Sequence, residues 1–417
     1  MRTPAVMLLA AVLVSAPFVR PAVAGSASCA PVRTEPAWPL PELRPEVPPG
    51  YAPAPEHEVE RGLWLIGERA EREIVSSAYR VRDAAAEALI DRIICRLVPE
   101  YAADIRAYLV RVPDFNASMM PNGAMQIWTG LLLRVDGEAE LAAVIGHEIG
   151  HYLRSHSLTN FRKRRNTLSL TVAGSLGLAA VGTSSNTLSL FQITMIAGIF
   201  TFSRAQEREA DAIGVALLAR AGYDPMAASR VWAKLLDELP EQRRRRPALF
   251  DTHPPTPRRM ERLATLAKRL RPDGGGEVGG ESFEKAVAGI RDMLWEDQLE
   301  RGEVPRTLVL VDRMIAAGRD PALAHCLKAE ALRRRGNRGD LAAALADYER
   351  ARAMTDDLPA WCWRGLGLAL WRTGRRQEAR APLGRYLARA GDPPDRAAIE
   401  FYLSSDEGAG RNGPEPP

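Results

Sequence analysis

The stretch that decides the fold and the site is His147-Glu-Ile-Gly-His151, an H-E-x-x-H pattern inside a proline-free segment, residues 138–156. Apolar residues recur in this segment at helical spacing, which predicts a helix. Residues four apart lie on one face of a helix, so the two imidazoles can bind one metal ion. Glu148 projects beside them, where it can take a proton from a metal-bound water. The alternative is a structural helix with two surface histidines.

A second acidic segment downstream supplies what such a metal site lacks, because a catalytic zinc takes three protein ligands and keeps one position open for water. Residues 203–214 are predicted to begin a helix and carry Glu207, Glu209 and Asp211. Glu207 and Asp211 are four residues apart and share a face. This spacing predicts Glu207 as the third zinc ligand and Asp211 as an outer carboxylate that holds a ligand imidazole. Glu209 lies off that face and is predicted to be solvated. The alternative is an ordinary acidic helix start.

The two motifs together resemble those of the HtpX-type and CAAX-endopeptidase-like gluzincin metallopeptidases, which pair H-E-x-x-H with a downstream E-x-x-x-D. The resemblance covers residues 116–259 and includes Asn116-Ala-Ser-Met-Met-Pro-Asn-Gly123. It implies one zinc ion per chain, held by His147, His151 and Glu207, with Glu148 as general base and Asp211 as the outer carboxylate. The long membrane-spanning pair of the HtpX branch is absent from the sequence. The chain is therefore more similar to the soluble periplasmic branch with C-terminal tetratricopeptide repeats.

The segment Thr252-His-Pro-Pro-Thr-Pro257 is rich in proline, which predicts a stiff loop around His253. In some periplasmic relatives the matching histidine is an additional, inhibitory zinc ligand, so the resemblance implies that His253 is a regulatory or fourth ligand. A neutral imidazole on the zinc would occupy the position that water needs. Arg258 or Arg259 would anchor the loop through a carboxylate, and Arg259 matches the family better. The alternative is a capped turn with an exposed histidine.

A small sheet is predicted before the H-E-x-x-H helix. Residues 107–112 alternate as a strand does, residues 121–123 are a turn signal, and residues 125–128 form a second predicted strand. An exposed edge of this sheet would take up an extended peptide by main-chain pairing, which carries little sequence information. We expect this substrate edge strand at Asn116, Ala117, Ser118 and Met119.

A nearly uncharged stretch, residues 168–202, separates the two metal motifs. It divides at residues 182–186 into two apolar pieces, each shorter than the roughly 20 residues that a membrane-spanning helix needs. A helical hairpin over the active site is predicted, either buried in the core or touching a membrane or an unfolded substrate. The basic run at residues 162–165 favours anionic lipid, so membrane-surface contact is expected through residues 162–202. A transmembrane hairpin is a third alternative.

The first 24 residues have the layout of a secretory signal, with a charged start, an apolar core and a cleavage site at Ala22-Val-Ala24. We expect a periplasmic protein after cleavage between Ala24 and Gly25; the alternatives are an uncleaved anchor and lipidation at Cys29. Export permits disulfides. Cys326 and Cys362 fall on the same helix of successive predicted repeats, so they form either a bridge or two buried thiols.

The sequence predicts an α+β fold, mostly helical, in which a gluzincin metalloprotease domain is followed by a helical solenoid. Glycines make residues 272–280 a flexible linker, which implies few obligatory contacts across it. Trp363, Leu366, Gly367 and Leu370 resemble a tetratricopeptide consensus, and such units stack into a concave surface for a protein partner; the alternative is a helical cap. The predicted order is signal 1–24, proline-rich arm or linker 25–58, peptidase 59–271, linker 272–280, repeats 281–405 and flexible tail 406–417.

These features predict an exported zinc endopeptidase. The resemblance implies a role in quality control of the bacterial envelope, with unfolded, misfolded or unassembled outer-membrane or periplasmic proteins as substrates. The alternative is a periplasmic chaperone or assembly scaffold with weak or latent activity and a mainly structural zinc, although the intact Glu148 argues against lost catalysis. The net charge is only +4 over 417 residues, so no nucleic-acid partner is expected.

Overall fold

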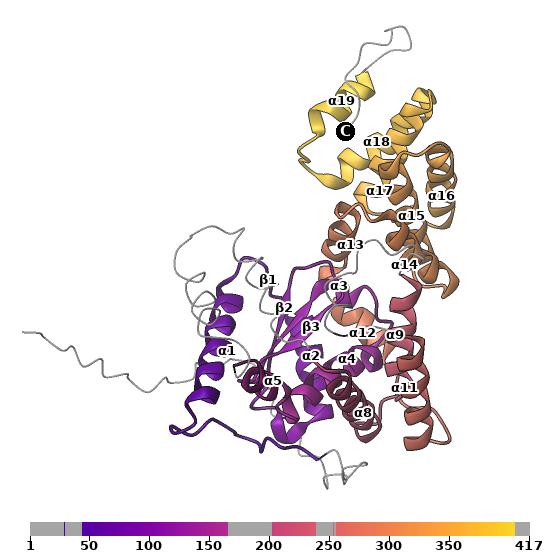
Figure 1. The fold of residues 1–417 in the computed structure, drawn as a ribbon. Coiled ribbons are helices and arrows are strands. Elements are labelled where there is room, and N and C mark those ends of the chain that lie inside the picture. The colour runs from indigo at the N-terminus through magenta and orange to yellow at the C-terminus, as the bar shows by residue number, and fades with distance from the viewer. Residues whose placement is uncertain (1–28, 30–43, 166–201, 239–252, 254–255, 405–417) are drawn as a thin grey trace, which may run out of the picture.

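The protein is described by a computed structural model in which helices surround one small sheet (Figure 1). The structure describes Cys29, residues 44–165, residues 202–238, His253 and residues 256–404. The predicted signal, the tail and the apolar stretch apart from Phe202 lie outside these described residues. Within the described part, no helix is both long and apolar enough to cross a membrane.

The sheet has four short strands in the order β1-β2-β4-β3, with β2 and β4 parallel and the outer pairs antiparallel. The strands are β1 (Arg80–Val81), β2 (Arg106–Val110), β3 (Ala117–Met119) and β4 (Ala124–Trp128). Two strands were expected close to β2 and β4, and both are confirmed. Gly123 forms the expected turn between β3 and β4 with φ +85°, and a Cβ there would collide with the carbonyl of Asp104. β3 lies at one edge of the sheet, as expected.

Helices of the peptidase part pack on this sheet and on one another (Figure 1). They are α1 (Glu58–Ser76), α2 (Ala84–Leu97), η2 (Pro99–Tyr101), α3 (Thr129–Leu132), α4 (Glu138–Leu153), α5 (His156–Arg165), α8 (Arg204–Arg220), α9 (Ala227–Asp237) and α11 (Pro257–Leu270). Every residue of α4 is buried. This helix carries the H-E-x-x-H pattern, so the alternative of a surface helix with two exposed histidines is wrong.

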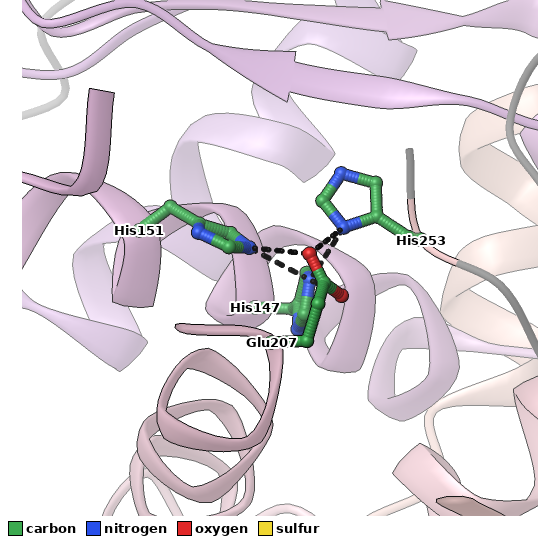
Figure 2. A group of neighbouring side chains, drawn as sticks. All are labelled: His147, His151, Glu207 and His253. Carbon is green, nitrogen blue, oxygen red and sulfur yellow. Dashed lines mark hydrogen bonds and ion pairs between the residues drawn. The ribbon is translucent and has the colours of Figure 1, made fainter. Parts of the chain in front are cut away.

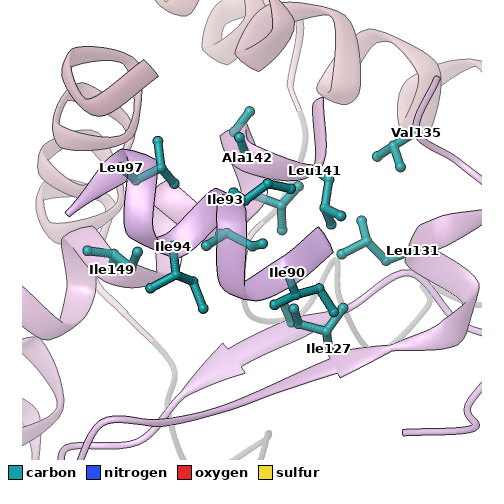
Figure 3. Packing of buried hydrophobic residues seen from close by; sticks show 14 of the residues in the cluster. Ile90, Ile93, Ile94, Leu97, Ile127, Leu131, Val135, Leu141, Ala142 and Ile149 are labelled. Carbon is teal, nitrogen blue, oxygen red and sulfur yellow. The ribbon is translucent and has the colours of Figure 1, made fainter. Parts of the chain in front are cut away.

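The main core lies between α2, α4 and the sheet (Figure 3). Ile93 and Leu97 of α2 pack with Leu141 and Ile149 of α4, and Ile127 of β4 closes the cluster from the sheet. All five side chains are fully buried, and burying one such side chain contributes about 1.5–3 kcal/mol. The core therefore packs against the metal-site helix along its length.

The described part of the proline-rich arm is bound to the peptidase domain. The backbone N–H of Glu46 donates to the carbonyl of Leu153 at 2.8 Å, and the hydroxyl of Tyr101 donates to the carbonyl of Val47 at 2.7 Å. Cys29 forms a disulfide with Cys95 on α2. A sulfur in a disulfide cannot carry a thioether lipid, so this pairing argues against lipidation at Cys29.

The glycine-rich segment 272–280 was expected to make few contacts, and this expectation is wrong. The carbonyls of Val278 and Gly279 accept the N–H groups of Ala139 and Glu138 at 3.1 and 3.2 Å. These are first-turn donors of α4, which have no partner inside their own helix. The segment therefore completes the start of the metal-site helix instead of acting as a free tether.

The first helices beyond the glycine segment also belong to the peptidase core. They are α12 (Gly280–Val287), η3 (Ala288–Ile290) and α13 (Arg291–Glu300), and they bury Phe283, Val287, Ile290 and Leu294 in the main cluster. An ion pair adds to this packing, because a guanidinium nitrogen of Arg111 lies 2.7 Å from a carboxylate oxygen of Asp297. The structure therefore packs α12 and α13 with the peptidase part, whereas the sequence analysis assigned them to a separate repeat domain.

The remaining helices form stacked antiparallel pairs that rise from the peptidase part (Figure 1). They are α14 (Val304–Ala316), α15 (Pro321–Arg335), α16 (Asp340–Met354), α17 (Ala360–Arg372), α18 (Arg376–Ala390) and α19 (Arg396–Ser404). Cys326 on α15 and Cys362 on α17 form a disulfide, so the bridge is the alternative that the structure supports. The mostly helical α+β fold is confirmed.

Candidate metal centre

Four side chains from three parts of the chain converge on one point (Figure 2). His147 and His151 come from α4, Glu207 comes from α8, and His253 precedes α11. One ligand atom from each lies within 4.8 Å of the others, and all four residues are buried. Nε2 of His147 is 3.1 Å from Nε2 of His151 and 3.1 Å from Nδ1 of His253. The structure therefore brings together the three expected zinc ligands and the proposed fourth.

Close packing of α4 against α8 makes this convergence possible. A Cβ on Gly150 would lie 3.0 Å from the Cα of Ala210, and a Cβ on Gly214 would lie 3.1 Å from the backbone nitrogen of His147. Larger residues would push the helices apart and move Glu207 away from the imidazoles. Gly150 of the H-E-x-x-H pattern and Gly214 of α8 therefore allow the close packing of the two helices near the metal ligands.

The carboxylate of Glu207 shows that these residues fit a bound cation. Both of its oxygens are buried and accept no hydrogen bond from the described residues. Yet Nδ1 of His253 and Nε2 of His151 lie 2.8 and 3.4 Å from Oε1. These contacts place the imidazole nitrogens and the carboxylate oxygens around one centre. Three imidazoles and one carboxylate are a donor set that suits a divalent transition metal such as zinc.

Electrostatics keep His151 and Glu207 in the form that binds a metal. Burial lowers the pKa of His151 well below its ordinary value, so its imidazole is neutral. Burial alone would raise the pKa of Glu207, but His253 and His151 outweigh it and hold that pKa well below the usual range. A neutral imidazole and an ionised carboxylate are the ligating forms.

Asp211 occupies the outer position that the sequence predicted. Its Oδ1 lies 3.1 Å from Nδ1 of His147, so it can accept the N–H of a ring whose Nε2 faces the centre. Arg259 donates to both oxygens of Asp211, at 2.6 Å to Oδ1 and 3.0 Å to Oδ2, and Arg262 donates to Oδ2 at 2.7 Å. Although burial raises the pKa of Asp211, Arg259 and His147 lower it below its ordinary value. The aspartate is therefore a charged anchor.

Arg259 also fixes the segment that carries His253. Its Nη1 donates to the His253 carbonyl at 3.2 Å, and its guanidinium lies 3.7 Å from the ring centroid of Trp232. Arg258 is exposed. The structure therefore places Arg259, the better match to the family, at the anchoring position, and the alternative of an exposed His253 is wrong because this residue is 3% exposed.

Glu148 lies beside the ligand group without joining it. Its Oε1 is 3.7 Å from Nε2 of His253, and the residue is buried. Burial raises the pKa of Glu148, although His253 and His147 oppose the rise. A carboxylate with a raised pKa next to a metal site is suited to accept a proton and return it.

A second outer contact, missed in the sequence, supports His151. Its Nδ1 lies 2.9 Å from Nδ1 of His156, whose Nε2 lies 3.0 Å from Oε2 of Glu209. Glu209 also pairs with Arg154 at 2.7 Å and is half-buried, so it is only partly solvated. Ser155 has φ +47°, which turns the chain after α4 and brings His156 back over His151. The sequence did contain one signal for this contact: His156 is the third histidine within the ten residues 147–156.

Phe202 and the sheet edge complete the surroundings of the site. The ring of Phe202 stacks on His151 with centroids 3.8 Å apart. Met119 and Met120, at the end of the edge strand, line one pocket together with His151 and Trp64. Asn116, Ala117, Ser118 and Met119 are all buried, so the expectation that this edge is exposed is wrong, and pairing with a peptide would require the edge to be uncovered. The predicted substrate strand therefore lies beside the metal ligands, and its binding of peptide stays a prediction.

An H-E-x-x-H helix with a glutamate from a second helix defines a metallopeptidase centre of the gluzincin class. Residues 82–267 match Peptidase family M48, so this part of the chain is an M48 peptidase domain.

Named relatives match part of the chain. The chain is 27% identical over 216 residues to the beta-barrel assembly-enhancing protease of Escherichia coli (strain K12), covering 50% of this chain and 44% of that protein. It is 31% identical over 156 residues to the mitochondrial metalloendopeptidase OMA1 of Schizosaccharomyces pombe, covering 37% of this chain and 44% of that protein. The alignments thus span less than half the length of these relatives.

Proposed function

We propose that this chain is a zinc-dependent endopeptidase. The observation that carries the proposal is the convergence of His147, His151 and Glu207 beside the buried Glu148. Bound zinc supplies Lewis acidity to the scissile carbonyl and lowers the pKa of a water. The M48 domain and the metalloendopeptidase names of the relatives support the same reaction class.

The residues of the chain have separate tasks in this reaction. Glu148 takes a proton from the attacking water and passes it to the leaving amine. Asp211 and His156 orient the two ligand imidazoles through their Nδ1 atoms. The edge strand β3 pairs with an extended substrate beside the metal ligands.

His253 makes the resting centre latent in this proposal. Catalytic zinc sites keep a position open for water, whereas sites closed by four protein ligands are typical of structural zinc. His253 provides a fourth ligand atom, 2.8 Å from Oε1 of Glu207. Its displacement would open the position that water needs. Since Arg259 holds the His253 carbonyl, movement of this loop and loss of the Arg259 contact go together.

The proposed setting is the periplasm, after removal of the predicted signal between Ala24 and Gly25. Two disulfides, Cys29–Cys95 and Cys326–Cys362, suit an oxidising compartment. Similarity to the beta-barrel assembly-enhancing protease supports a role in the bacterial envelope. The substrates would be unfolded, misfolded or unassembled outer-membrane or periplasmic proteins.

A casein-degradation assay on the purified mature chain tests the reaction. We expect cleavage in zinc-loaded protein, loss of cleavage with a chelator and recovery when zinc is returned. Glu148→Gln should bind zinc as the parent does and remain inactive. The proposal would be contradicted if neither the zinc-loaded parent nor the zinc-loaded His253→Ala variant cleaved casein or unstructured peptides.

A chaperone or assembly scaffold with a structural zinc is the second candidate. The four candidate ligands favour it, because a site closed by all of them would have no place for water. The two candidates differ in the His253→Ala variant, which gains activity if the site is a latent protease. A scaffold would suppress aggregation of an unfolded protein equally well with Glu148→Gln.

A further inference from the structure

The arginine that contacts both Asp211 and the His253 segment lies against a tryptophan ring. Cζ of Arg259 is 3.7 Å from the centroid of the Trp232 ring on α9, and both side chains are buried. An aromatic face attracts a cation, most strongly when the ring is tryptophan and when water is excluded. The Trp232 ring therefore stabilises the guanidinium on the side that faces α9.

The hydrogen bonds of Arg259 depend on the orientation of its guanidinium. Nε and Nη2 donate to the Asp211 carboxylate, at 3.0 Å to Oδ2 and 2.6 Å to Oδ1, while Nη1 donates to the His253 carbonyl at 3.2 Å. The N–H groups of a guanidinium lie in one plane as a fixed fork, so they cannot be redirected separately. With the Trp232 ring against Cζ, the group cannot turn toward α9, and the three bonds are kept together.

Trp232 is itself held in place from several sides. Its ring centroid lies 6.2 Å from the ring of Phe115 and 6.2 Å from the ring of the ligand His147. Two residues further along α9, the ammonium of Lys234 donates to Glu140 of α4 at 2.6 Å, which ties this helix to the metal-site helix. A side chain can orient its neighbours only when its own rotamer is fixed by packing. Trp232 meets this condition.

The two partners of Arg259 are bound with unequal strength. Asp211 carries the opposite charge and accepts from two nitrogens of the guanidinium, a fork that adds both energy and geometric specificity. The His253 carbonyl carries no net charge and accepts one longer bond. Loss of the Trp232 ring should therefore release the His253 segment before it breaks the contact between Arg259 and Asp211.

We propose that Trp232 is a positioning residue that, through Arg259, keeps His253 at the metal as its fourth ligand. This inference rests on the proposed peptidase function and adds to it the side chain that sets the latency of the resting centre. Trp232 acts on the orientation of Arg259 and not on the metal or the substrate directly.

The visible spectrum of the cobalt-loaded full chain tests this role without hydrolysis, because the spectrum changes with the number and geometry of the metal ligands. Trp232→Met and Trp232→Leu both remove the aromatic face and keep an apolar side chain, so the test survives if one of them does not fold. Trp232→Phe keeps an aromatic face. Leu235→Ala is the matched control, because it removes a fully buried side chain from the same helix. Circular dichroism checks that each variant is folded.

We expect the cobalt spectra of both ring-free variants to shift from that of the parent toward that of His253→Ala, while Trp232→Phe and Leu235→Ala keep the parent spectrum. At saturating zinc, casein cleavage by the ring-free variants should rise about tenfold, the effect of a desolvated cation–π contact on an equilibrium constant. A parent spectrum in the ring-free variants would overturn the proposal. So would an equal shift in Leu235→Ala, because any loss of packing on α9 would then have the same effect.

Failure of this inference and failure of the proposed function give different results. If His253→Ala itself leaves the parent spectrum unchanged, His253 is not on the metal and the role of Trp232 falls, whereas casein cleavage that depends on Glu148 still supports a peptidase. If the spectra shift as expected but no zinc-loaded variant cleaves casein or peptides, the peptidase function is wrong and the positioning role of Trp232 remains.

Discussion

Nδ1 of His151 lies 2.9 Å from Nδ1 of His156, so a metal ligand is held by a second histidine. If Nε2 of His151 binds the metal, its Nδ1 carries the proton and donates to His156. Nε2 of His156 then carries a proton toward Glu209, 3.0 Å away. This series of hydrogen bonds fixes one tautomer at each of the two imidazole rings.

His156→Ala should therefore weaken zinc binding by about 10–100-fold, the usual effect of losing an outer partner of a ligand. Competition with a fluorescent zinc chelator measures this change. His57→Ala is the matched control, because His57 is a 54% exposed side chain on another element. Equal zinc affinity in the His156 variant and this control would remove His156 from the site.

Glu148→Gln should keep zinc near parent stoichiometry and lose about 10²–10⁴-fold in peptide hydrolysis, because the amide cannot take the proton. Metal content by atomic emission and cleavage of a fluorogenic peptide give the two readouts. His147→Ala is the comparison that should lose the metal. A Glu148→Gln protein without zinc would mean that Glu148 is itself a ligand.

Asp211→Asn should still bind zinc, about 10–100-fold more weakly. The amide no longer neutralises Arg259, whose Nη2 lies 2.6 Å from Oδ1, so thermal stability should fall as well. Chelator competition and a melting curve measure the two effects separately. Parent-like affinity would exclude Asp211 from the site, and complete absence of metal would make it a ligand.

His253→Ala should raise basal proteolysis, since removal of the fourth ligand leaves a position for water. Initial rates on casein at saturating zinc measure the gain. Metal content should be retained, because His147, His151 and Glu207 remain. Unchanged activity would contradict the role of His253 as an inhibitory ligand, and lower activity would assign His253 a role in the reaction itself.

A chain that ends at Arg271 should fail to fold stably. It loses Phe283, Val287, Ile290 and Leu294 from the main core. At about 1.5–3 kcal/mol each, their loss is comparable to the whole stability of a typical domain, about 5–15 kcal/mol. A chain that ends at Gly302 keeps these helices and is the control. Zinc binding and a cooperative melt in the shorter chain would contradict this prediction.

Local spacing was enough to predict the centre of the site. His147, His151, Glu207 and Asp211 lie on two helices whose periodicity is visible in the sequence, and the strands near residues 107–112 and 125–128 follow from alternation. These features depend on neighbours within a few residues, which is the information that sequence patterns carry.

Contacts between distant segments could not be predicted in this way. The Cys29–Cys95 disulfide and the bonds from residues 278–279 to the start of α4 join segments more than 60 residues apart. The glycines of that segment indicated flexibility, but Gly279, with φ +65°, instead lets the backbone approach Glu138 closely. Glycine alone does not distinguish a free chain from a tightly packed one.

The packing of α12 and α13 into the peptidase core has a geometric consequence for substrate choice. It fixes the separation between the helix pairs and the metal centre, as a rigid arm would. A polypeptide held on the helix pairs would present to the centre only the bonds that lie a set length of chain away. Such an arrangement would measure distance along a substrate and would select a cleavage position without reading the residues at the cut.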